Sequence, residues 1–293
     1  MGQIIFVVAR ESIEALLIIG ILFAWMSSRE GAEKGKHWIY AGVLAGLGLA
    51  TLLALTLVGV THFLGGEARN WFEIGMLTLA STLIVQMVMW MRSHGRTLKK
   101  EMENRLDRDL SAANWWGVFF LVTIAVGREG SETAMFLYGS FLQLATWASY
   151  ASFFGAVAIG LAIAMVLFYL LQLGNRFISW KWFFRITEIM LLFLGASLFL
   201  TASEKLLNGY LSNVDLPAWF YSSVWNTSHI LSESSLIGDL LASLFAYRSR
   251  PIGWDLVTVA VFALVVWRLL AWQSTRQAQQ TRPQTQAAAN PGG

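Results

Sequence analysis

Two stretches of the sequence carry the same pattern of charged residues, Arg-Glu-x-x-Glu. The two copies comprise Arg10, Glu11 and Glu14, and Arg128, Glu129 and Glu132. Residues three apart share a face of a helix, so the two glutamates of each copy point the same way. Both copies lie in long apolar stretches, where a charged side chain costs about 2.5–3.5 kcal/mol at the bilayer centre. Such a cost in two copies of one pattern indicates a functional site.

The residue types favour a site for a hard cation. If the two helices cross near the middle of the membrane, four carboxylates meet, and with two arginines they carry a formal charge of −2. All-oxygen ligation suits Mg, Ca, Mn or ferric iron. We therefore predict that the four glutamates are metal ligands and that the two arginines orient and balance them. Two alternatives are that Arg–Glu pairs only fasten helices together, or that the carboxylates relay protons.

Other candidates for the site have weaker signals. Glu73 and Glu188 lie nearer the ends of apolar segments, where a relay or gate and a plain interfacial carboxylate are both possible roles. Met87, Met89 and Met91 resemble a metal-binding run, but on a helix Met89 faces away from the other two. We interpret these methionines as packing residues.

The composition is that of a membrane protein, with 56% hydrophobic and 13% charged residues. Cysteine is absent, which excludes disulfides and thiolate metal sites. The sequence has neither a nucleotide-binding glycine loop nor a catalytic constellation at membrane depth. We expect a transporter rather than an enzyme, with no tightly bound cofactor and no nucleic-acid partner.

Seven segments are apolar and long enough to cross a hydrocarbon core of about 30 Å. They are Ile4–Met26, Trp38–Phe63, Trp71–Met91, Trp115–Tyr138, Trp147–Leu173, Trp182–Leu206 and Leu256–Trp272. Of the 21 Lys and Arg residues, 15 fall on one side of these segments and 4 on the other. The positive-inside rule then predicts that the N-terminus is outside and the C-terminus is cytoplasmic.

The segments also divide into two similar halves. In this orientation the first and fourth segments, which carry the motif, run in opposite directions. The segment Phe72–Leu77 resembles Thr187–Leu192, and each lies near the start of the third segment of its half. We predict an all-α integral membrane protein with seven transmembrane helices: two inverted three-helix repeats plus one helix, an arrangement known from transporters. The alternative is that apolar helices merely look alike.

This division assigns a role to every part of the chain. The expected parts are a first repeat at 1–91, a cytoplasmic amphipathic connector at 92–114, a second repeat at 115–207, an external loop with an interfacial helix at 208–253, a seventh helix at 254–272 and a disordered cytoplasmic tail at 273–293.

At these residues the sequence resembles the oxidase-dependent iron permease family, the Ftr1/EfeU-like permeases. That family carries Arg-Glu-Gly-Leu-Glu in its first and fourth membrane helices and Trp-Met at the end of the third, matched here by Trp90-Met91. The likeness runs from about Gln3 to Trp272. This chain departs from the family motif at Ser12, Ile13 and Ser131, whereas the charged residues of both copies are intact.

The resemblance implies a high-affinity permease of the bacterial inner membrane that imports iron, in ferric form after oxidation by a partner outside. It implies a periplasmic oxidase or cupredoxin-like delivery protein, and the short N-terminus leads us to expect that partner as a separate chain. Two alternatives stay open: a transporter of another hard cation, Mn or Mg, and a scaffold subunit with structural Arg–Glu pairs.

Overall fold

The structure is a computed structural model, and it describes residues 1–27, 35–94, 115–142, 144, 146–172, 180–211, 217–233 and 235–288. The described residues form helices and one isolated bridge between Ser223 and Ile252, without a strand. The main helices are α1 (Gly2–Ser27), α2 (Lys36–Phe63), α3 (Gly66–His94), α5 (Trp115–Leu142), α6 (Trp147–Gln172), α7 (Trp180–Leu206), α8 (Leu236–Phe245) and α9 (Gly253–Ala288).

The helices reproduce the predicted apolar segments. Within the described residues, every one of those segments falls inside one helix. Five helices, namely α2, α3, α6, α7 and α9, are long and apolar enough to cross a membrane. Helices α1 and α5 have similar lengths, 26 and 28 residues, but each carries the three charged residues of its motif copy. These charges set the two motif helices apart from the other five.

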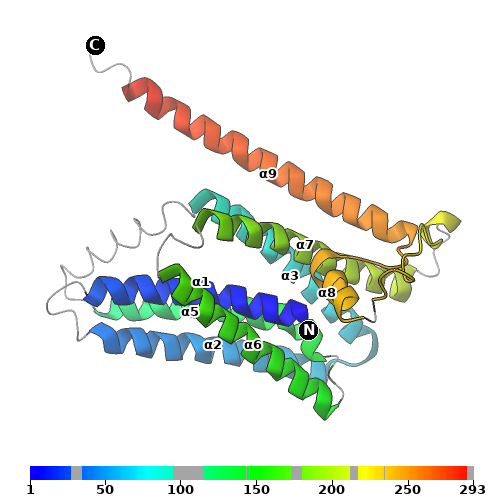
Figure 1. Cartoon of the computed structure of the whole chain (residues 1–293), viewed down its shortest axis with the longest axis horizontal. Helices are drawn as coiled ribbons and strands as arrows, with labels where there is room; N and C mark the ends of the chain where they lie inside the picture. Colours follow the sequence, from blue (N-terminus) through cyan, green and yellow to red (C-terminus); the bar gives the residue numbers. More distant parts are fainter. Residues whose placement is uncertain are drawn as a thin grey trace.

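The long helices lie in layers (Figure 1). Helices α1, α2, α5 and α6 lie together, with α1 packed on α6 and α5, and α2 packed on α5. Helices α3 and α7 pack side by side above them, and α7 also contacts α9 and α8. The largest buried apolar cluster joins α1, α3, α5, α6, α7 and α8, including Val7, Ile84, Phe136 and Leu194.

Small residues set the close approach of α2 to α5. Gly42, Gly46 and Ala50 are spaced by four residues along the buried face of α2. A Cβ atom at Gly46 would lie 2.8 Å from the amide nitrogen of Gly127, and one at the motif's Gly130 would lie 2.6 Å from the Cβ of Ala50. Small residues are the usual means by which membrane helices approach closely.

The contact of α6 with α1 uses the same device. Ala156, Gly160 and Ala164 are also spaced by four, and both alanines are buried. A Cβ atom at Gly160 would lie 2.9 Å from the carbonyl oxygen of Ile5. Each motif helix therefore packs closely against a row of small residues on a second helix. This close packing sets the position of the motif helix, and with it that of its glutamates.

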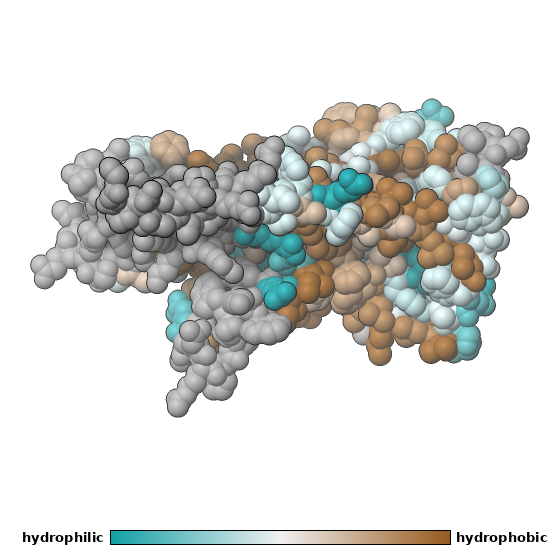
Figure 2. Space-filling model, turned by 90° about the horizontal axis from the view of Figure 1, so that it is seen from above, coloured by the Kyte–Doolittle hydropathy of each residue, from teal (hydrophilic) through white to brown (hydrophobic). Residues whose placement is uncertain are grey.

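Large apolar side chains cover much of the outer surface. In the face seen in Figure 2, hydrophobic residues dominate the described surface and hydrophilic ones gather in small groups. Exposed examples are Leu44 and Leu52 on α2 and Met165 on α6, which are 71%, 62% and 63% exposed. Apolar exposure of this extent fits contact with lipid.

The remaining parts differ in how they compare with the sequence predictions. Within residues 208–253, for which an interfacial helix was predicted, the structure has α8, which packs against α7 and α1. The predicted connector at 92–114 lies mostly outside the described residues, since α3 ends at His94 and the next described residue is Trp115. Disorder was predicted for the tail, but α9 continues to Ala288. Ala, Gln and Arg are good helix formers, so they extend the helix where apolar residues end.

Candidate metal centre

Three of the four predicted glutamate ligands meet where α1 contacts α5. One carboxylate oxygen each from Glu11, Glu14 and Glu129 lies within 4.8 Å of the other two. Glu11 and Glu129 are buried, and Glu14 is half-buried. Within the described part of the chain, no other group of three His, Asp or Glu residues is close enough to hold one metal ion.

Several oxygens of this cluster are open. Glu11 Oε2, Glu129 Oε2 and Glu132 Oε2 are buried without a hydrogen-bond partner among the described residues. An unpaired carboxylate oxygen is costly in a dry interior unless a cation or a proton joins it. The cluster therefore has the oxygen ligands of a cation site, and it has buried carboxylate oxygens that lack a hydrogen-bond partner.

Arg10 is the positive partner of the first motif copy. Its guanidinium is 2% exposed and lies 2.6 Å from Glu11 Oε1 and 2.6 Å from Glu14 Oε1. The same guanidinium donates to the Sδ atoms of Met87 and Met91, at 3.2 Å each. Arg10 thus holds one oxygen of each glutamate of its own copy.

The second copy is arranged differently. Arg128 Nε lies 2.9 Å from Glu132 Oε1, so Glu132 turns toward its own arginine and lies outside the group of three. The Arg128 side chain is 39% exposed, and its guanidinium carbon lies 5.0 Å from the centre of the Trp90 ring. The two copies share a sequence pattern but differ in burial and in partners.

The residues that sequence reasoning missed are on α3. Met87, Trp90 and Met91 contact the two motif arginines, although the methionines were interpreted as packing residues. The available signal was the spacing of 87, 90 and 91, which places all three on one helix face. The methionines were interpreted as packing residues because Met89 faces away from the other two.

Glu73 and Glu188 lie apart from the cluster, at opposite ends of the α3–α7 pair. Glu73 forms ion pairs with Arg69 at 3.1 Å and with Lys205 of α7 at 2.9 Å. Glu188 of α7 forms an ion pair with Arg92 of α3. Each end of this helix pair is therefore closed by an ion pair between the two helices.

A cavity of about 740 Å³ opens between the first residues of α1 and the adjoining ends of α3, α5 and α7. Glu73 and Lys205 line its wall, and Ile4, Ala80 and Phe136 also line it. These last three residues belong to the buried apolar cluster. Phe136 lies one helical turn from Glu132, so this part of the cavity wall lies near the second copy of the motif.

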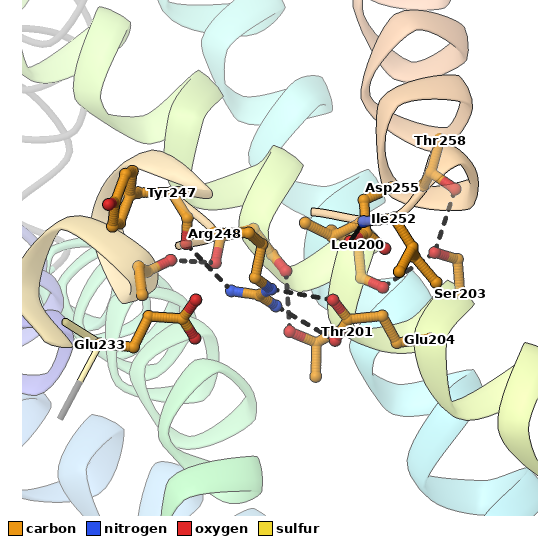
Figure 3. Close-up of polar contacts among 12 residues, drawn as sticks. Leu200, Thr201, Ser203, Glu204, Glu233, Tyr247, Arg248, Ile252, Asp255 and Thr258 are labelled. Atoms are coloured by element: carbon orange, nitrogen blue, oxygen red, sulfur yellow. Dashed lines mark hydrogen bonds and ion pairs between the residues drawn. The ribbon is translucent and has the colours of Figure 1, made fainter. Parts of the chain in front are cut away.

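Arg248 lines this cavity and joins the loop after α8 to α7 through polar contacts (Figure 3). It donates to both carboxylate oxygens of Glu204 on α7, at 2.8 and 3.1 Å. Burial acts to lower the pKa of Arg248, but the hydrogen bonds to Glu204 and its charge outweigh burial and raise that pKa. Glu233 accepts from the backbone amide of Ser249 at 2.5 Å, which fastens the loop further.

The fold and the cluster define an all-helical membrane protein with a buried carboxylate site, the class of a transporter. The chain matches the Iron permease FTR1 family over residues 1–278 and belongs to that family. It is therefore a permease rather than an enzyme.

Curated relatives agree with this assignment. The chain is 30% identical over 249 residues to the ferrous iron permease EfeU of Escherichia coli O6:H1, covering 84% of this chain and 86% of the relative. It is 26% identical over 245 residues to the ferrous iron permease EfeU of Yersinia pestis, covering 83% of each chain. No solved structure matches the chain.

Proposed function

We propose that the protein imports iron across the cytoplasmic membrane of a bacterium, through a site made of Glu11, Glu14, Glu129 and Glu132. The observation that carries this proposal is the buried meeting of three of these carboxylates, with open oxygens, in a chain of the iron permease family. Glu132 completes the set when its carboxylate leaves Arg128. Iron is the transported ion and not a resident cofactor.

The valence of the ion has two candidates. The resemblance implies ferric iron, formed by an oxidase outside, and four carboxylates are hard ligands that suit it. Ferrous iron is the second candidate, since relatives carry that name and the formal charge of −2 balances a divalent ion. Uptake measured with a reductant in the absence of oxygen, which keeps the iron ferrous, separates the two. Continued uptake that a ferrous chelator then blocks indicates ferrous iron, and loss of uptake indicates ferric iron.

For the architecture we propose seven transmembrane helices, with α1 and α5 added to the five apolar ones. Packing of α1 on α6, α2 on α5 and α3 on α7 supports two inverted repeats at 1–91 and 115–207. The repeat exchanges the α1–α6 contact with the α2–α5 contact, and the α3–α7 contact joins equivalent helices of the two halves. The connector at 92–114, the loop at 208–253, the helix at 254–272 and the tail at 273–293 complete the proposed division.

We further propose that the N-terminus is outside and the C-terminus is cytoplasmic, which places the cavity on the outer side. The chain has no cysteine, so single replacements report cleanly. With this orientation, an impermeant thiol reagent labels Ser222→Cys in intact cells and Ser274→Cys only after permeabilisation. The reverse pattern contradicts the orientation.

A separate periplasmic oxidase or cupredoxin-like protein is the proposed source of iron at the outer face of the membrane.

The direct test of the site removes single charges. We expect Glu14→Gln or Glu132→Gln to lower radioactive iron uptake by more than about 100-fold, since loss of a metal-site partner alone costs 10–100-fold. The host cells lack other iron importers, and the amount of protein in the membrane is measured for each variant. Glu67→Gln is the matched control, because Glu67 is exposed at the start of α3.

The outcomes separate the alternatives. Normal uptake in both Glu14→Gln and Glu132→Gln contradicts the iron site and favours a structural role for the Arg–Glu pairs. Competition of iron uptake by an equal concentration of Mn or Mg favours a site for another hard cation.

A further inference from the structure

One face of α3 contacts both arginines of the doubled motif. Met87, Trp90 and Met91 are spaced so that they project from the same side of the helix. Met87 and Met91 accept hydrogen bonds from Arg10 of α1, at 3.2 Å each. The Trp90 ring lies under the guanidinium of Arg128 of α5, with 5.0 Å to the ring centre.

The contact at Arg10 lies in a dry place. Arg10 is 2% exposed and Met87 is 3% exposed. Each terminal nitrogen of the guanidinium binds one glutamate oxygen and one sulfur: Nη1 binds Glu11 and Met87, and Nη2 binds Glu14 and Met91. The sulfurs therefore satisfy N–H groups that the glutamates leave over.

Resting on the proposed function, we propose that Met87, Trp90 and Met91 are positioning residues for the ion site. They hold the two motif arginines so that the guanidinium groups stay in place when an entering ion draws the glutamate oxygens toward itself. Through them α3 contacts both halves of the motif.

The residue types suit this task. A thioether is a weak, neutral and polarisable acceptor, so it holds a guanidinium without adding negative charge beside the glutamates. An acid at position 87 or 91 would compete for Arg10 and change the charge of the site. A plain hydrocarbon would leave buried N–H groups without partners. The Trp90 ring likewise attracts the Arg128 cation through its face without carrying a charge.

The decisive experiment compares two replacements of similar size at one position. Met87→Leu keeps an apolar side chain and removes the acceptor, whereas Met87→Gln is polar and keeps one. If Met87 positions Arg10, Met87→Leu raises the KM for iron uptake by about tenfold, as expected for an unpaired buried donor, and Met87→Gln stays within about threefold of the parent. Met165→Leu on the exposed face of α6 is the matched control and leaves KM unchanged.

A packing role predicts the reverse order, with Leu tolerated and Gln harmful in this buried place. That order, or equal KM values for Met87→Leu and the parent, overturns the proposal. At position 90 the same logic applies: Trp90→Phe retains the ring face and retains uptake, whereas Trp90→Leu loses both. Equal uptake by the Trp90→Phe and Trp90→Leu variants also overturns it.

A second measurement keeps this inference separate from the iron assignment. The Tm of the purified protein in detergent, without metal, depends on the Arg10 contacts whatever ion is carried. A lower Tm for Met87→Leu than for Met87→Gln supports the positioning contact even if the parent takes up no iron. The opposite order of Tm contradicts the contact while leaving the glutamate site intact.

Discussion

At the scale of residues, the two copies of one motif have become unequal. Arg10 is buried and has four polar contacts, with two carboxylates and two sulfurs. Arg128 is 39% exposed and contacts one carboxylate and one aromatic face. A buried charge depends on its partners far more than an exposed one does. The first copy should therefore tolerate change less than the second.

This inequality is measurable with the same conservative change in both copies. A lysine ammonium is a compact point charge and cannot span the four acceptors around Arg10. We expect Arg10→Lys to lower iron uptake by about tenfold or more, and Arg128→Lys by less than about threefold. Uptake per amount of inserted protein is the measurement. Equal losses in the two variants would contradict the asymmetry.

Sequence reasoning reached part of this residue-level arrangement. The three-residue spacing places Glu11 beside Glu14 on one face, and the structure brings both to Glu129. Spacing does not fix side-chain rotamers, so it did not reveal that Glu132 turns to Arg128. The contacts from α3 were also out of reach, since which helix covers the motif depends on tertiary packing.

At the scale of elements, the helices were predictable and their partners were not. Long apolar runs fixed the existence and approximate bounds of the helices, because such runs must satisfy their backbone hydrogen bonds internally. The pairing of α2 with α5 and of α6 with α1 rests on small residues at every fourth position, which hydrophobicity alone does not distinguish. Helix α9 continues to Ala288 because helix propensity persists after the apolar residues end, and the disorder predicted for the tail stays a prediction.

Two glycines of α2 provide a matched test of that packing. A Cβ at Gly46 would lie 2.8 Å from the backbone nitrogen of Gly127, whereas one at Gly48 would meet nothing within 4 Å. We expect Gly46→Ala to push α5 away, lower the Tm in detergent and reduce uptake. Gly48→Ala should leave the Tm and the uptake unchanged or raise the Tm slightly, since alanine is more favourable than glycine inside a helix by about 1 kcal/mol. A Tm for Gly46→Ala at or above that of Gly48→Ala would refute the close approach.

At the scale of the whole molecule, the features that bear on ion passage are a cavity at one end and ion pairs at both ends of the α3–α7 pair. The cavity of about 740 Å³ is lined by apolar side chains that include Phe136, which lies one helical turn from Glu132. Ion pairs join α3 to α7 at both ends, through Glu73 with Lys205 and through Arg92 with Glu188. We propose that these two ion pairs, which hold Glu73 and Glu188, act as gates at the two ends of the α3–α7 pair.

The central claim is that carboxylates of α1 and α5 together hold the iron ion. The most direct measurement is anomalous scattering at the iron edge from crystals of the purified protein loaded with iron. We predict one iron peak between Glu11, Glu14 and Glu129, with oxygen ligands and with Arg10 still in contact with Met87 and Met91. An iron peak elsewhere, such as beside Glu204 of α7, would contradict this claim. So would motif carboxylates that lie apart with no iron between them.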